Sequence, residues 1–236
     1  MAIFSCGPAD TIPALCRGER GLLSDWIGGT RRGSLRTCAL LIVLGCGCYG
    51  FTVGLWHGWR MAGYVAVKLP AVIFLTLLLN GLLNGMLALV LGSGIGLRQS
   101  LQFLLTGFAT MSIILGALSP ITFFATLNTP PPSDPAAAQW HAMILLSHTA
   151  AIAFAGVVAH QRLLSYLCEF ADTRRAGAHT FIAWLSGNLF VGAQISWILR
   201  PFFGTPGLAV QFLRPDPLRG NFYESVLTAL RNLTPL

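Results

Sequence analysis

Long apolar runs separated by short polar connections dominate the pattern of this chain. A helix that crosses the hydrocarbon core of a bilayer needs about 20 predominantly apolar residues. Five segments reach that length, at about 38–56, 70–91, 99–125, 140–162 and 180–202. The pattern therefore predicts an all-α polytopic membrane protein, in which residues 36–203 form a bundle of five transmembrane helices with interfacial amphipathic helices beside it.

Three segments outside these spans have patterns of their own. Residues 1–35 mix Pro, Gly, Asp and Arg without periodicity, which predicts a largely irregular cytoplasmic arm. Residues 56–68 are short and rich in aromatic residues, so we expect them to lie along the outer surface of the membrane. Residues 162–175 continue the fourth span with an apolar spacing typical of an amphipathic helix.

The C-terminal tail, residues 204–236, carries a helix signal. Asn221 and Glu224 make a capping-box pattern, in which each side chain can bond the backbone amide of the other. An apolar stripe follows, so the tail is predicted to contain an amphipathic helix over 222–233. This helix either rests on the bundle or provides a docking surface for a partner.

Arg200 lies near the outer end of the fifth span and precedes Pro201. A guanidinium at that depth needs water, a lipid headgroup or a carboxylate. One expectation is that Arg200 extends to a lipid phosphate. The other is an ion pair with Asp216 or Glu224 that folds the tail back over the bundle, and the prolines beside Asp216 favour that residue.

Composition supports membrane insertion and excludes other classes. Hydrophobic residues make up 54% of the 236 residues and charged residues only 10%, with a mean hydropathy of +0.68. Because soluble domains carry about 25% charged residues, this chain has too few of them to form the polar surface of a soluble protein. Disorder and collagen are excluded in the same way, and six cysteines are too few for a disulfide scaffold.

The net charge of +7 predicts orientation rather than nucleic-acid binding. The arginines lie at span ends, where anionic headgroups bind them, and no basic patch alternates with aromatic residues. With the N-terminus inside, nine basic residues lie on the inner side and six, including Lys68, on the outer side. This majority predicts a multi-pass protein of the bacterial inner membrane with a cytoplasmic N-terminus and a periplasmic C-terminus.

Polar side chains inside the spans are candidate functional residues, because they are costly in a bilayer. By helical rise, Asn80, His148 and Gln194 share one level, and Asn84 and Asn188 share a second. They either bond between helices, which glycines at the same faces would bring close together, or line a polar path or small binding site.

The sequence offers no set of catalytic residues. His148 has no second histidine at its depth for haem, and no CxxC pair lies near the outer surface. Ser186 lacks the GxSG of an intramembrane protease, and no span contains paired carboxylates. We therefore expect no enzyme activity, no cofactor and no metal site.

Several stretches carry a resemblance to a known group. They include YVAVKLPAVIFLTLLLNGLLNGMLA, LRQS before GALSP, AFAGVVAH, GNLFVGAQISWILRPFFGTPGL and VQFLRPDPLRGNFYE. Over roughly 50–235, these resemble an uncharacterised family of bacterial polytopic inner-membrane proteins. Five close spans after a cytoplasmic N-terminus are also similar, in topology alone, to the Yip1-type architecture of membrane-trafficking scaffolds. The family carries no catalytic motif to transfer.

Two functions follow from these observations. The leading hypothesis is a non-enzymatic scaffold or accessory subunit of a membrane complex, whose partners are the lipid bilayer and either another membrane protein or further copies of itself. The alternative is a small transporter or channel that uses the polar layer at Asn80, His148 and Gln194.

Overall fold

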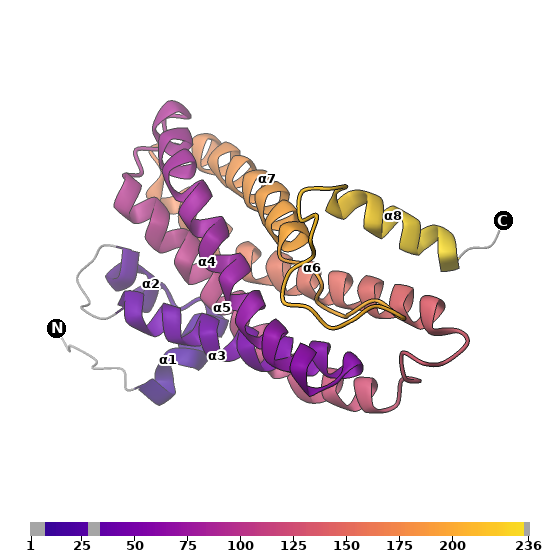
Figure 1. The fold of residues 1–236 in the computed structure, drawn as a ribbon. Helices are drawn as coiled ribbons and strands as arrows, with labels where there is room; N and C mark the ends of the chain where they lie inside the picture. Colours follow the sequence, from indigo (N-terminus) through magenta and orange to yellow (C-terminus); the bar gives the residue numbers. More distant parts are fainter. Residues whose placement is uncertain (1–7, 28–33, 234–236) are drawn as a thin grey trace.

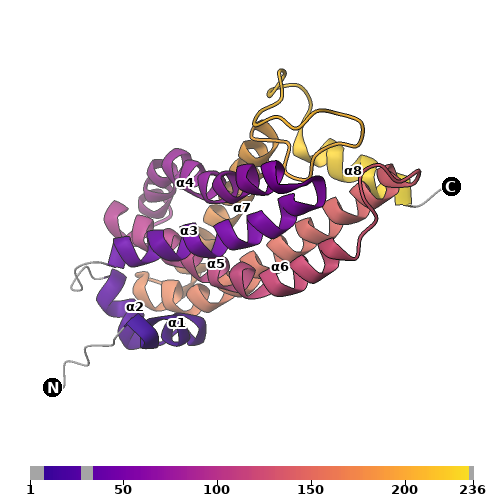
Figure 2. The same cartoon turned by 60° about the horizontal axis from the view of Figure 1, so that its bottom comes forward.

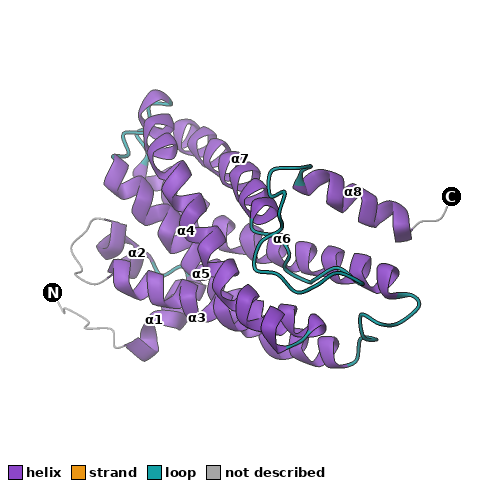
Figure 3. Cartoon of the chain, viewed as in Figure 1, coloured by secondary structure: helices purple, strands orange, loops and turns teal. Residues whose placement is uncertain are grey.

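The computed structural model describes residues 8–27 and 34–233, and every regular element in them is a helix (Figure 3). In chain order the elements are α1 (Pro8–Arg17), α2 (Arg20–Ile27), α3 (Ser34–Gly54), the 3₁₀ turn η1 (Leu55–His57), α4 (Trp59–Val90), α5 (Leu97–Leu127), α6 (Ala137–Phe170), α7 (Arg174–Ile198) and α8 (Phe222–Leu233).

The predicted all-α fold with five apolar helices is confirmed. Five helices, α3 to α7, are long and apolar enough to cross a membrane. Helices α4, α5, α6 and α7 form a ring in which each packs on the next and α7 returns to α4. Helix α3 packs on α4 and α5 from outside the ring (Figures 1 and 2).

The bundle has two different ends: α1 and α2 lie at one end, and α8 lies at the other (Figure 1). We call the end where α3, α5 and α7 finish the cap end, because residues 199–233 fold there. These residues, a loop followed by α8, are the cap. The opposite end, beside α1 and α2, is the arm end.

The prediction of an irregular arm is wrong for the described part of it. Residues 8–27 form α1 and α2, which pack against α5. Their buried apolar side chains are Ala14, Leu15, Leu22, Leu23 and Trp26. Gly18, at a φ of 66°, ends α1, and the Glu19 amide bonds the Ala14 carbonyl oxygen behind it. Each apolar stripe is only a few residues long, so its pattern is weak in sequence. The remaining residues of the predicted arm before Ser34 lie outside the described residues.

The second correction concerns residues 56–68, which do not form a separate surface piece. Apart from the η1 turn and Gly58, they are the start of α4, which runs on through Pro70. Glycines of α3 allow this close hairpin. A Cβ atom at Gly50 would lie 2.6 Å from the Val65 carbonyl oxygen, and one at Gly54 would lie 2.7 Å from that of Met61. The aromatic and polar residues of this segment therefore belong to the bundle.

The other predicted boundaries lie close to the observed helices. Helix α5 extends the predicted 99–125 by two residues at each end, and α6 includes the amphipathic continuation after the fourth span. Helix α7 begins at Arg174 and ends at Ile198, before the Arg200–Pro201 turn. Helix α8 has the predicted bounds, and the Glu224 amide donates to the Asn221 Oδ1 atom at 2.9 Å, as an N-terminal cap requires.

Candidate functional site

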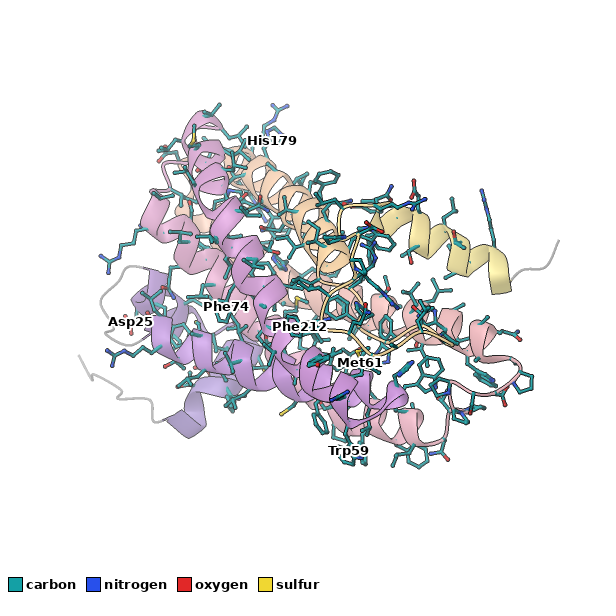
Figure 4. The ribbon with its side chains drawn as sticks, in the orientation of Figure 1. Asp25, Trp59, Met61, Phe74, His179 and Phe212 are labelled. Carbon is teal, nitrogen blue, oxygen red and sulfur yellow. The ribbon has the colours of Figure 1, made fainter. Side chains whose placement is uncertain are left out.

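Lys68 is the only lysine of the chain, and the cap covers it completely. Its Nζ atom donates to the Pro201 carbonyl oxygen at 2.9 Å. It also lies 4.8 Å from the ring centre of Phe212 and 5.7 Å from that of Phe202. Figure 4 marks Phe212, where the cap loop crosses α4. A carbonyl oxygen and two aromatic faces thus replace the water that a buried ammonium has lost.

Arg200 connects the end of α7 to the returning tail. Its Nη1 and Nη2 atoms donate to carbonyl oxygens of Trp197 (3.0 Å), Pro217 (2.8 Å), Asp216 (2.7 Å) and Arg219 (3.1 Å). The guanidinium lies 4.0 Å from the centre of the Trp197 ring, whose Nε1 atom also donates to the Arg219 carbonyl oxygen. Burial lowers the pKa of Arg200 from its usual value, but a guanidinium remains charged in proteins.

The tail folds back over the bundle, but the predicted ion pair is wrong. Among the described residues, no carboxylate oxygen lies within 4.0 Å of the Arg200 guanidinium. Asp216 directs its carbonyl oxygen toward Arg200 and keeps its side chain exposed. Glu224 is exposed at the first turn of α8. The main chain of the turn, rather than either carboxylate, holds the arginine.

His148 also lies beneath the cap. Its Nδ1 atom is 2.7 Å from the Tyr49 hydroxyl oxygen, and its ring stacks on Phe203 of the cap loop at an interplanar angle of 16°. Next to Phe203, Gly204 adopts a φ of 72° and packs against the His57 ring so closely that a Cβ atom would overlap it. The loop therefore packs against side chains of η1 and α6.

Three asparagines meet at the contact between α4 and α7. The Nδ2 atoms of Asn80 and Asn84 lie 3.1 and 3.3 Å from one acceptor, the Oδ1 atom of Asn188. Trp184 adds a bond from its Nε1 atom to the Asn84 carbonyl oxygen at 2.7 Å. Gly187 lies beside this pair, and a Cβ atom there would be 3.9 Å from the Asn84 Oδ1 atom and 4.0 Å from the Asn80 Nδ2 atom, which is ordinary contact.

These contacts correct the predicted polar layer. Asn80 joins Asn84 and Asn188, although the sequence predicts a different level for it. His148 belongs to the cap end with Tyr49, and Gln194 is half-buried without a hydrogen-bond partner among the described residues. The level of Asn80 depends on where the second span begins, and α4 begins at Trp59 rather than at Pro70, so Asn80 lies deeper than a count from Pro70 indicates. Such a count also does not say which way a side chain faces around the helix.

Within residues 8–27 and 34–233, no three His, Cys, Asp or Glu side chains are grouped as a metal ion would require. The cap-end site has cations and aromatic rings, which suit contacts with carbonyl oxygens and anions. Comparisons with protein-family models, with curated proteins and with solved structures find no match to this chain.

Lys68 is the site residue that sequence reasoning misses, because the predicted spans place it in an outer loop. A signal was present, because a single lysine lies between apolar residues in VAVKLP. To place Lys68 inside the second span, that span must begin before Pro70. The prediction starts it at Pro70 because a proline is more often found at the first turn of a helix than inside it.

The first prediction concerns how Arg200 holds the cap. We expect Arg200→Gln to speed trypsin cleavage after Arg219 at least about tenfold, because hydrogen bonds to charged groups contribute about 1.5–3 kcal/mol each. The bonds after Arg200 and Arg214 precede prolines and resist trypsin, which leaves Arg219 and Arg231 as the cleavable arginines of the cap. The fragment that ends at Arg219 reports the opening of the turn. Asp216→Asn is the matched control and should cleave at the wild-type rate. Equal acceleration in both variants would instead support the ion pair.

The second prediction concerns the asparagine cluster. Side-chain hydrogen bonds between membrane helices average about 0.6 kcal/mol, so Asn188→Ala should lower the free energy of unfolding by about 1 kcal/mol. A double-mutant cycle with Asn80→Ala, measured by denaturant unfolding in detergent, should give a coupling of about 0.6 kcal/mol. Gln194→Ala should change stability little. A coupling of zero would mean that the Asn80–Asn188 bond does not contribute.

Proposed function

We propose that this protein is a non-enzymatic scaffold or accessory subunit of a complex in the bacterial inner membrane. Two observations support the proposal. The polar residues at the α4–α7 contact bond one another, as in a packed bundle. The cap is held on that bundle by Lys68 and Arg200, so it forms a fixed platform. The five-span topology, which resembles the Yip1-type architecture of membrane-trafficking scaffolds, agrees with this role.

The observation that carries the proposal is an exposed apolar stripe on α8. Tyr223, Leu227 and Leu230 are 49%, 50% and 47% exposed, and their spacing puts them on one helix face. Ala229 is buried, and α8 packs against α6 and α7. An apolar stripe of this spacing is the feature by which a helix binds an apolar groove. Since α8 lies beside a membrane-spanning helix, we propose that the partner is also a membrane protein.

The partner is tested by capture from native membranes. Tagged full-length protein should bring down a stoichiometric partner, quantified by mass spectrometry. Leu227→Asn should reduce the recovery of that partner at least about tenfold, because buried anchor side chains contribute about 2 kcal/mol or more to interfaces. Thr228→Asn, at the exposed neighbouring position, is the matched control. A protein recovered alone, or a partner that Leu227→Asn retains in full, would contradict the proposal.

A small transporter or channel is the second candidate, and one atom favours it. The Nδ2 atom of Asn188 is buried and has no hydrogen-bond partner among the described residues. A polar solute passing between α4 and α7 could accept from it. The test is transport by the purified protein in liposomes. If the protein conducts a solute, and an Asn188→Leu variant of wild-type stability loses that flux, the transporter hypothesis replaces the scaffold hypothesis.

The orientation is part of the proposal. Because Lys68 is buried in α4, it leaves the count of outer charges, and the excess of basic residues on the inner side becomes nine against five. This supports an arm end in the cytoplasm and a cap in the periplasm. A reporter active only in the periplasm should work when fused after Leu236 and be silent within 172–178. The reverse pattern would overturn the orientation.

A further inference from the structure

The cap loop contains an arginine that leaves most of its hydrogen-bond donors unused. Arg214 donates from its Nη2 atom to the Thr205 hydroxyl oxygen at 2.9 Å, and its guanidinium has no second partner among the described residues. A guanidinium has five N–H donors, so four remain. Thr205 is the acceptor in this bond, which leaves its own hydroxyl proton free to donate. Arg200 differs, because its Nη atoms already donate to four carbonyl oxygens.

The positive charge around Arg214 is not neutralised. Burial lowers the pKa of Arg200, and the nearby charge of Arg214 lowers it further, whereas Asp216 has a smaller opposite effect. The charge of Arg214 also acts on Lys68 beneath the loop. In the part of the chain that the structure describes, no carboxylate oxygen lies within 4.0 Å of any of these three cations. Three like charges at one place favour the binding of an anion.

Exposed apolar side chains lie on the same loop. Leu208, Phe212 and Leu213 are 51%, 42% and 43% exposed. The Leu208 amide bonds the Thr205 carbonyl oxygen at 3.1 Å, and Leu213 directly precedes Arg214, so these leucines are close in sequence to both polar groups. A segment that combines exposed leucines with an arginine is amphipathic, as is typical of the boundary between water and lipid.

Helix α4 gives the depth of this loop. Lys68, which the loop covers, lies about 33 Å along α4 from its last residue, Val90, at the arm end. The hydrocarbon core of a bilayer is about 30 Å thick, so this length places the loop at the level of the lipid headgroups. In Figure 2 the loop between α7 and α8 projects from the side of the bundle, where lipids surround a membrane protein.

Charge, depth and exposed leucines together select the ligand. A phosphate group accepts two parallel N–H bonds from a guanidinium. The phosphate of a lipid also brings acyl chains that exposed leucines contact, and a free phosphate ion lacks them. The three cations repel the ammonium group of a zwitterionic headgroup, which favours a lipid of net negative charge.

We propose that Arg214 and Thr205 bind the phosphate group of an anionic phospholipid, whose acyl chains contact Leu208 and Leu213. This site goes beyond the scaffold role, because it belongs to the loop and does not use the exposed stripe of α8. Leu227→Asn, which tests the partner surface, should therefore bind the lipid as the wild type does. Partner capture and lipid binding can succeed or fail separately.

Two lipids that differ in headgroup charge test the site. The full-length protein in a neutral detergent is titrated with phosphatidylglycerol or with phosphatidylcholine of the same acyl chains, and the first bound lipid is quantified by native mass spectrometry. The wild type should bind phosphatidylglycerol at least about tenfold more tightly, since a headgroup that the cations repel forfeits a hydrogen bond to a charged group. Inorganic phosphate at the same concentration should not displace it.

Variants assign the preference to the loop. Arg214→Gln should weaken binding of phosphatidylglycerol at least about tenfold, and Thr205→Val, which keeps the side-chain shape, about three- to tenfold. Arg231→Gln is the matched control, because it removes the same charge from an exposed position of α8 and should leave the affinity nearly unchanged. If Arg214→Gln does not fold, Thr205→Val and the wild-type preference still decide.

Three results would overturn the proposal. Equal affinity of the wild type for both lipids would mean that headgroup charge is not recognised. Equal weakening by Arg214→Gln and Arg231→Gln would show attraction by net charge alone. Displacement of the lipid by an equal concentration of inorganic phosphate would identify a site for a free anion in place of a lipid site.

Discussion

At the cap end, main-chain carbonyl oxygens take the place of counter-ions for two cations, and the position of the cap on the bundle depends on these hydrogen bonds. The chain has 15 basic and only 8 acidic residues, and no carboxylate oxygen of the described residues lies within 4.0 Å of the Lys68 or Arg200 side-chain nitrogens. Lys68 uses the carbonyl oxygen of Pro201, and Arg200 uses four carbonyl oxygens around the returning turn. Both cations also lie near the faces of aromatic rings, and the ring quadrupole attracts a positive charge. The cap is thereby tied to α4 and α7 at the same time.

The membrane fold could be predicted from the sequence because it depends on one quantity, the length of an apolar run. The same quantity says nothing about the short helices α1 and α2, whose buried residues come in groups too small to stand out. It also failed at Pro70, where the hairpin between α3 and α4 depends on Gly50 and Gly54 lying opposite the main chain of α4. The contact of these glycines with α4 depends on both helices, so it cannot be predicted from either segment by itself.

The sequence identifies several residues of the candidate site, but it does not identify the groups that they contact. Arg200, Asp216, Asn188 and His148 all take part in close contacts, but depth along a helix did not identify their neighbours. The turn at Asp216 offers Arg200 a carbonyl oxygen, which every residue possesses and no sequence pattern reveals. Asn188 accepts from two asparagines that lie one turn apart on α4 and therefore share one helix face. The direction in which each side chain faces around its helix, and the distance between the two helices, decide these pairings, and both depend on packing.

The use of carbonyl oxygens by Arg200 also affects how this protein can change during evolution. A docking contact made to side chains constrains both partners, so that a change in one requires a change in the other. Here only the arginine is constrained, because residues 216–219 contribute main-chain atoms that almost any substitution keeps. The turn can therefore vary in sequence while its path is retained. Relatives with the same cap would share Lys68 and Arg200 and differ freely in the segment that these residues hold.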